Sequence, residues 1–489
     1  MKIKTSLLIS CAIWICAAAQ LHAAATEDEA KRLTKVFQSY LSDTQGVVSV
    51  ALDGDGYSVK LDFGPLADIA AAMSKDKTGV IKMSPVEFKI ASQGDGKWQV
   101  VQNQPFTFDL DMGEQGAIHG KEDVSKFSGV YDEKLGNFAN FTREVENFTL
   151  SERIKDPNGI ESLVEASFKN MKVEQTATAS AGGGADLDIK YTVDAFSENI
   201  NASGKTEAGV PPMNFLLTST GGAFSVTGKN TKAKPFLDIL AFFVAHKSKE
   251  LIANDQAMLK SVLTASLPLF DNLQGTGQMN GFKVASQFGE FGADTFDFAV
   301  DMNGVVKDGK FREKIGLKGI NVPAALVPPW AVNLVPKNMT FDFTLSGFDL
   351  ASPADTILKQ IDFTKTPPLP DGFEAVLLPS LMPKGTVDIG LGPTEISNDT
   401  FNLKLEGTMS AGPAAIPTGK ATITAKGLDE IMKVVQAAPP EAGLGGGMAV
   451  IIAAKGIAKA GADGALTWDV ESAPGGKVLV NGIDPTTLK

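Results

Sequence analysis

The feature that most constrains the fold is the stretch 229–273, where two helix-length apolar patterns follow each other. Strand-like sequence fills most of the chain on either side. In the first pattern, apolar residues recur every three or four positions, as on one stripe of a helix: Phe236, Ile239, Leu240, Phe243 and Val244. After Asn254, a candidate N-cap, the same spacing returns and ends before Pro268. The sequence therefore predicts a central helical pair inside a β-rich protein.

Strands are predicted wherever apolar and polar residues alternate. In residues 186–194, Leu187, Ile189, Tyr191 and Val193 alternate strictly with charged or polar residues. This pattern is typical of antiparallel strands that are solvated on one face. Asp-Gly turns at 53–56 and 94–97 separate strand-like runs and predict hairpins.

Amphipathic helices are predicted directly after strands at several places. Residues 26–29 form a capping box, Thr-Glu-Asp-Glu, which predicts a helix over 27–41. A strand, a Gly-containing turn and a helix follow one another within 57–73, 340–361 and 421–437, and the central helical pair also follows a strand. In two of these turns, Asp349 and Asp429 are candidate helix caps.

These patterns predict a β-rich α+β fold. We expect large curved antiparallel sheets of many hairpins, with amphipathic helices packed on one face, in two similar halves around the central helical pair. The expected divisions are a signal peptide (1–25), an N-terminal helix plus antiparallel β domain (26–228), the central helical pair (229–273) and a C-terminal β-rich domain with two strand-to-helix units (274–489).

The first residues carry the pattern of a secretory signal peptide. Lys2 and Lys4 precede an apolar run over 7–19, and small residues allow cleavage after Ala23 or Ala25. The run is short for a transmembrane helix, although an uncleaved N-terminal anchor remains the alternative. The sequence thus predicts Sec-type export to the periplasm or the extracellular space, and a mature chain that is not an integral membrane protein.

Few residues suit metal or nucleophilic chemistry. Cys11 and Cys16 both lie in the predicted signal peptide, so the mature chain is expected to contain no cysteine and hence no disulfide or thiolate site. His119 and His246 are the histidines beyond it, whereas a zinc site needs three or four nitrogen or sulfur ligands. Phosphate-loop, nucleophile-elbow and His-Glu-x-x-His motifs are absent. We therefore expect no catalytic residue, no metal and no cofactor.

The charge balance argues against nucleic acid as a partner. The chain carries 45 basic and 57 acidic residues, for a net charge of −12, and it has no basic run. Binding to nucleic acid requires a positive patch that neutralises phosphates. The sequence therefore predicts no nucleic-acid partner.

The order of motifs resembles an alphaproteobacterial cell-envelope protein family of unknown function, domain-of-unknown-function family 2125. The resemblance rests on the signal peptide followed by Leu33-Thr34-Lys35, on Gly46-Val47-Val48, on Asp62-Phe63-Gly64-Pro65-Leu66 and on Val480-Asn481-Gly482. It would cover nearly the whole mature chain, and it implies a location in the cell envelope. The family has no known catalytic residues, so the resemblance assigns none here.

Together these observations predict a non-enzymatic periplasmic protein that binds a lipid or another apolar small molecule within a curved β-sheet. The candidate lining residues are Phe236, Leu240 and Phe243 of the first central helix, which we expect to meet the sheet, and Trp330 in a Pro-rich segment. Two alternatives remain open. One is a scaffold or adaptor that binds envelope proteins during assembly, and the other is a carboxylate-dependent glycan hydrolase.

Overall fold

The computed structural model describes residues 25–67, 80–155, 160–203, 213–246, 248–461, 463–473 and 476–487. The predicted signal peptide and most of the helix expected at 66–73 lie outside these ranges. The chain divides into two compact units, each described by itself below. Unit 1 comprises Met1–Leu273 and Ile357–Pro370, and unit 2 comprises Gln274–Thr356 and Asp371–Lys489.

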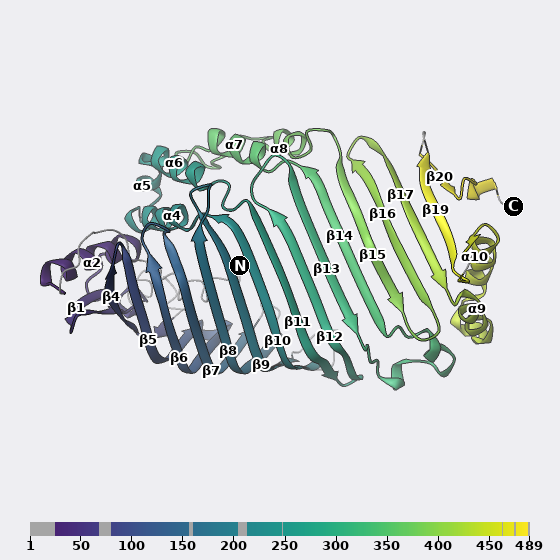
Figure 1. The fold of residues 1–489 in the computed structure, drawn as a ribbon, viewed down its shortest axis with the longest axis horizontal. Coiled ribbons are helices and arrows are strands. Elements are labelled where there is room, and N and C mark those ends of the chain that lie inside the picture. The colour runs from purple at the N-terminus through teal and green to yellow at the C-terminus, as the bar shows by residue number, and fades with distance from the viewer. Residues whose placement is uncertain are drawn as a thin grey trace. The chain divides into compact units, whose positions relative to one another are not determined.

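Unit 1 is built on an antiparallel sheet, drawn in purple to teal in Figure 1. Its strands run in the order β1-β2-β4-β5-β6-β7-β8-β9-β10, and β3 pairs with the far end of β5, on the same edge as β4. Their bounds are β1 (Val48–Asp53), β2 (Gly56–Leu61), β3 (Val80–Met83), β4 (Val86–Gly94), β5 (Lys97–Asp111), β6 (Gly116–Asp132), β7 (Asn137–Lys155), β8 (Glu161–Ala179), β9 (Ala185–Ser203) and β10 (Met213–Thr231).

The core of unit 1 forms where the first helix, α2 (Glu27–Tyr40), packs on the sheet. The predicted helix is confirmed, and its N-cap is Thr26, whose hydroxyl accepts a hydrogen bond from the backbone N–H of Glu29 at 3.2 Å. Leu33 and Phe37 are fully buried, and the Phe37 ring meets Phe88 of β4 edge to face at 6.0 Å. Burying each of these two side chains contributes about 1.5–3 kcal/mol.

The central helical region consists of three helices where the sequence predicted two. They are α4 (Ala233–Ala245), α5 (Lys249–Asn254) and α6 (Gln256–Ser266), all in unit 1. The additional helix arises because Ser248 caps it: the Ser248 hydroxyl accepts a hydrogen bond from the Leu251 N–H at 3.3 Å. Asn254 is consequently the last residue of α5, so its predicted role as an N-cap is wrong.

Unit 2 also contains an antiparallel sheet, in the order β12-β13-β14-β15-β16-β17-β19-β20. The short β18 shares an edge of β19 with β20. The bounds of the strands are β11 (Asn272–Ser286), β12 (Gly289–Asn303), β13 (Gly309–Lys318), β14 (Asn338–Phe348), β15 (Val387–Ser397), β16 (Asn402–Gly412), β17 (Ala415–Lys426), β18 (Lys459–Ala460), β19 (Leu466–Ala473) and β20 (Lys477–Val480).

The α-helices that follow the central region in the described part of the chain are α7 (Ala351–Gln360), α8 (Glu374–Leu381), α9 (Leu428–Ala437) and α10 (Gly445–Gly456). Asp349 caps α7 as predicted, because its carboxylate accepts hydrogen bonds from the Ser352 N–H and hydroxyl at 2.8 and 2.6 Å. Asp429 does not cap α9. Gly427, with φ of +73°, takes the N-cap position, and a Cβ there would lie 2.1 Å from the Thr400 carbonyl oxygen.

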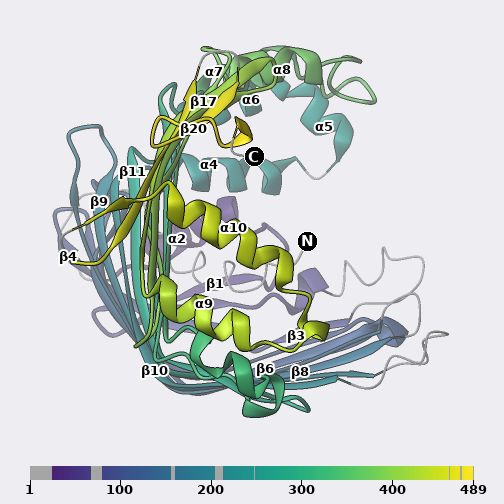
Figure 2. The ribbon, with the colours of Figure 1, turned by 90° about the vertical axis from the view of Figure 1, so that its right-hand side faces the viewer.

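The predicted β-rich α+β class, with antiparallel curved sheet and attached helices, is confirmed. Figure 2 shows helices on the concave side of the strands within each unit: α2 and α4 in unit 1, and α9 and α10 in unit 2. None of the helices in the described part of the chain combines the length and hydrophobicity that a membrane crossing would need.

Candidate functional site

The three residues predicted on the first central helix all lie on α4, and two of them, Phe236 and Phe243, are exposed. Leu237 and Phe242 are the buried residues of α4, which packs against α2 and α6. Phe236 and Phe243 are 38% and 47% exposed, and Leu240 is half-buried. The expected orientation of Phe236 and Phe243 is therefore wrong, because helix neighbours decided which stripe of α4 is covered.

The fourth predicted residue, Trp330, is half-buried in a 3-10 helix, η3 (Pro329–Leu334), which packs against α9 in unit 2. Neither Trp330 nor the three residues of α4 lines any of the three cavities described below. Their role in ligand binding stays a prediction.

Unit 2 contains an apolar surface that extends over more residues than the four predicted ones. Residues directly opposite each other in antiparallel strands point to the same side of the sheet. The strand register places one such row across eight strands: Val300, Glu313, Phe343, Leu391, Gly407, Ala421, Val470 and Val480. A second row, beside it, contains Met302, Phe311, Leu345, Ile389, Met409 and Gly419. We call this side of β12–β17, β19 and β20 the apolar face.

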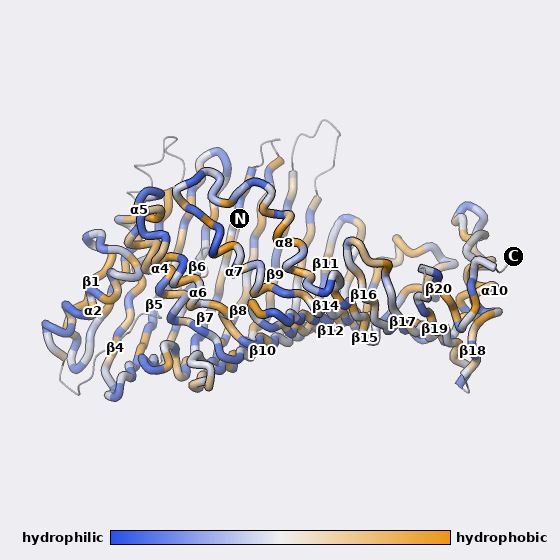
Figure 3. Tube along the Cα trace, turned by 90° about the horizontal axis from the view of Figure 1, so that it is seen from above, coloured by the Kyte–Doolittle hydropathy of each residue, from blue (hydrophilic) through white to orange (hydrophobic). Residues whose placement is uncertain are grey.

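The other side of the same strands is polar. Arg312 donates two hydrogen bonds to Asp342, at 2.9 and 2.6 Å, and Lys420 pairs with Glu471 at 3.1 Å. The Arg312 guanidinium holds the pKa of the Asp342 carboxyl below its usual range. Figure 3 shows hydrophobic (orange) and hydrophilic (blue) positions intermixed over these strands.

Much of the apolar face is exposed to solvent. Phe341, Met409 and Val478 are 42%, 41% and 49% exposed, and Met339, Ile396 and Ile423 are exposed as well. An antiparallel sheet normally packs its apolar side onto a core. Single exposed apolar residues are common on proteins, whereas a contiguous exposed patch marks a binding surface.

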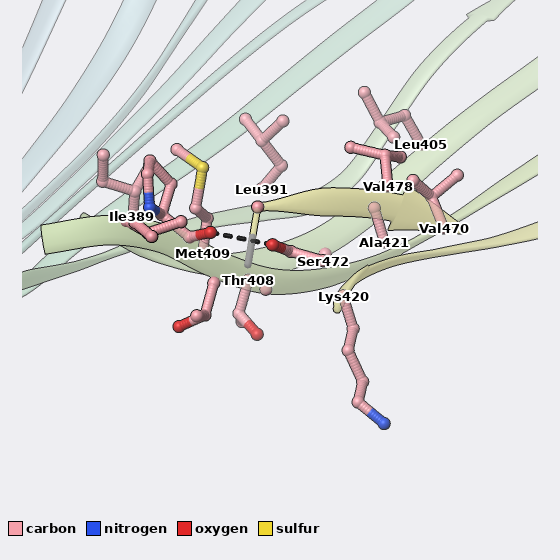
Figure 4. Close-up of a pocket in the computed structure, with 16 residues that line it drawn as sticks. Ile389, Leu391, Leu405, Thr408, Met409, Lys420, Ala421, Val470, Ser472 and Val478 are labelled. Carbon is pink, nitrogen blue, oxygen red and sulfur yellow. Dashed lines mark hydrogen bonds between the residues drawn. The ribbon is translucent and has the colours of Figure 1, made fainter. Parts of the chain in front are cut away.

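The first cavity is a hollow of about 530 Å³ on the apolar face, over β15, β16, β17, β19 and β20. Figure 4 shows Leu391, Met409, Val470 and Val478 on one side of the strands and Thr408 and Lys420 on the other. Two glycines, Gly407 and Gly419, form part of its floor. Because neither has a side chain, the strands lie close together and the floor is bare: a Cβ on Gly407 would lie 2.6 Å from the Lys420 carbonyl oxygen.

The second cavity, of about 550 Å³, lies between α10 and the same face and adjoins the first at Val470, which lines both. Ile451 and Ala454 of α10 face Ile423 and Trp468 of the sheet across it. The Trp468 indole N–H donates a hydrogen bond to the Ala454 carbonyl at 2.7 Å, which ties the helix to β19. Both cavities are of a size that accommodates small apolar ligands.

The third cavity, of about 660 Å³, is polar and lies in unit 1 over β5–β9. One cross-strand row there contains Asp109, His119, Ser151, Glu165 and Asn199, with 2.7 Å between His119 Nδ1 and Asp109 Oδ1. The His119 and Asp109 side chains are 60% and 48% exposed. Within the described residues, no hydrogen bond joins His119 to Ser151, so the row does not form a nucleophile–base pair.

The carboxylates of this polar cavity are also poorly placed for glycoside hydrolysis. Asp109 and Glu165 lie three strands apart, which is about 14 Å along the row at about 4.8 Å per strand. Glycosidases hold their two carboxyl groups about 5–9.5 Å apart. Among the described residues, no group of three or more His, Cys, Asp or Glu side chains is placed to hold a metal ion.

The other histidine of the described residues, His246, connects helices. Its Nε2 lies 2.7 Å from Asp255 Oδ2, its Nδ1 lies 2.7 Å from the Phe242 carbonyl oxygen, and its ring stacks on Phe242 at 3.9 Å. The Asp255 carboxylate raises the pKa of His246 above its ordinary value. These contacts fasten the end of α4 to the junction of α5 and α6.

The apolar face carries a sequence signal that the prediction of site residues missed. Apolar residues occupy alternate positions at Phe296, Phe298, Val300 and Met302 of β12, and again along β13, β14 and β16. The same alternation in 186–194 was used only to predict strands. No protein-family model matches the chain, and no curated protein matches it. The resemblance to the cell-envelope family therefore stays a prediction.

Proposed function

We propose that the protein is an exported, non-enzymatic binding protein that holds a lipid-like apolar ligand on the apolar face of unit 2. The observation that carries the proposal is the pair of adjoining apolar cavities on a contiguous, solvent-exposed apolar face. The predicted signal peptide supports location in the periplasm or outside the cell.

The energetics favour an apolar chain as the occupant. Each 100 Å² of apolar surface removed from water contributes about 2.5 kcal/mol, and the exposed side chains of Phe341, Met409 and Val478 provide such surface on the protein. A flexible chain that enters the hollow over Gly407 would bury surface on both partners. The apolar lining offers few hydrogen-bonding groups, so binding would depend on shape and hydrophobicity.

The alternative of a scaffold or adaptor would use the same face to bind another protein. A lipid-like ligand fits the apolar face better than a protein does, because the face contains two cavities that a flexible chain can fill. Stable protein interfaces are instead closely packed across a broad area.

Two neighbouring residues of β16 provide a matched test: both line the first cavity, but the Met409 side chain lies on the apolar side of the strands and the Thr408 side chain lies on the polar side. The mature protein would be purified, incubated with lipids extracted from the cell envelope, and analysed by native mass spectrometry. We expect lipid adducts on the wild type and on Thr408→Glu, and a loss of at least about 80% of them on Met409→Glu, because the carboxylate would have to be desolvated by the bound chain.

We expect Met409→Glu to fold normally, because Met409 is 41% exposed and a charged side chain at this position remains hydrated in the free protein. Absence of lipid on the wild-type protein, or equal binding by the two variants, would contradict the proposal.

A further inference from the structure

The apolar face contains one charged residue in its longest row. Glu313 of β13 lies directly opposite Val300 of β12 on one side and Phe343 of β14 on the other. Along β13, Phe311 and Ile315 share its side of the sheet, and all three are half-buried. The intervening residues Lys310, Arg312 and Lys314 are on the polar side.

The carboxylate of Glu313 has no protein partner within the described part of the chain. Of the basic residues near it along β13, Arg312 pairs with Asp342 and Lys310 pairs with Asp301, and Lys314 is exposed on the opposite side of the strand. All three basic side chains are therefore on the polar side of the sheet, away from Glu313. Water therefore solvates the Glu313 carboxylate as long as the face is open.

A ligand that covers this row of residues would remove water from the Glu313 carboxylate. An apolar chain lying over Phe343 and Leu391 removes water from the neighbouring carboxylate, and an ionised carboxylate without water or a partner costs several kcal/mol. The cost disappears if the ligand itself carries a cation or another strong hydrogen-bond donor at that point.

The dimensions of the row fit a head group at Glu313 and a chain in the first cavity. From Leu391 to Val470 the row crosses β15, β16, β17 and β19, which is about 14 Å at about 4.8 Å per strand. One leaflet of a bilayer, at half of about 30 Å, has a hydrocarbon layer of about the same length. Glu313 lies two strands, or about 10 Å, beyond Leu391.

Building on the proposed function, we infer that the apolar face selects amphiphiles with a cationic amine head group, and that Glu313 is the residue that recognises this group. The ammonium would donate hydrogen bonds to the Glu313 carboxylate, while the acyl or alkyl chain would run over Phe343 and Leu391 into the hollow at Gly407. Phosphate-only or neutral head groups would leave the carboxylate unpaired and would bind less tightly.

The test compares single-chain probes that differ in the head group. Dodecylammonium, dodecyl maltoside and dodecyl sulfate, each below its micellar concentration, would be titrated into the full mature protein by calorimetry. We expect the wild type to bind dodecylammonium about tenfold more tightly than dodecyl maltoside, because a hydrogen bond to a charged group contributes roughly that factor. Glu313→Gln should abolish this preference from both sides: dodecylammonium loses its charged partner and binds less tightly, and dodecyl maltoside binds more tightly because a neutral amide costs less to remove from water than a carboxylate. Glu313→Lys should shift the preference to dodecyl sulfate.

The matched control is Glu406→Gln on β16. Glu406 is exposed on the polar side, so the same chemical change there should keep the tenfold preference. Equal binding of the three probes by wild type and Glu313→Gln would overturn the inference and leave the proposed function intact. Loss of the preference in Glu406→Gln as well would also overturn it, because overall charge would then be the cause. Failure of the wild type to bind any of the three probes would contradict the proposed function itself.

Discussion

At the scale of single residues, the polar side of the unit 2 sheet depends on the Arg312–Asp342 pair. The Asp342 side chain is only 2% exposed, whereas the Arg312 side chain is 48% exposed. We predict that Asp342→Asn lowers the free energy of unfolding by about 1–3 kcal/mol, less than for a fully buried pair because solvent screens Arg312. Chemical denaturation monitored by circular dichroism would measure this.

The control for this prediction is Glu471→Gln. Glu471 pairs with Lys420, and both side chains are at least half exposed, so the loss should be below about 1 kcal/mol. Because the folded-state pKa of Asp342 is depressed, its contribution is present above the ordinary carboxyl value of about 3.9 and disappears as the pH falls through the lower folded value. A loss in Asp342→Asn no larger than in the control would refute the assignment.

At the scale of elements, His246 joins α4 to the α5–α6 junction and makes that junction sensitive to pH. Its folded-state pKa is raised by the Asp255 carboxylate, so its stabilising contribution is fully present below about 6.5 and is lost as the pH rises through the folded value. We predict that the wild type shows this loss in thermal unfolding between pH 5.5 and pH 9, and that His246→Gln does not. Asp255→Asn should behave like His246→Gln, and a wild-type-like loss in either variant would contradict the mechanism.

At the scale of the whole molecule, unit 1 is discontinuous in sequence. Segment Ile357–Pro370 belongs to it although more than eighty residues of unit 2 precede that segment. Gln256 of α6 makes two hydrogen bonds that hold the segment, one from its amide to Asp362 at 3.4 Å and one to its carbonyl from the Phe363 N–H at 3.3 Å. The integrity of unit 1 therefore depends on contacts between residues over a hundred positions apart.

We predict that Gln256→Ala increases hydrogen exchange at the backbone amides of 361–365 by about tenfold, because two hydrogen bonds of about 0.5–1.5 kcal/mol each are lost. Hydrogen-exchange mass spectrometry would detect the change. Gln93→Ala removes an exposed glutamine that bonds to Gln99 within unit 1 and should leave these amides unchanged. Equal exchange in the wild type and Gln256→Ala would show that other contacts hold the segment.

The sequence by itself determined the features that depend on near neighbours in the chain. Thr26 and Asp349 cap helices through hydrogen bonds to residues three positions away, and period-two alternation marks strands with one apolar side. These signals predicted the fold class correctly. The Asn254 cap was wrong because Ser248, six residues earlier, starts a separate helix.

Tertiary structure alone decided which apolar surfaces are covered. The helical pattern of α4 does not show whether Leu237 or Phe236 will meet a neighbour, since that depends on how α2 and α6 pack against it. Likewise, alternation assigns an apolar side to each of β12–β17, but only the register aligns Glu313 with Phe343, Leu391 and Val470. The physical reason is that burial and register arise from contacts between distant segments, which no local pattern encodes.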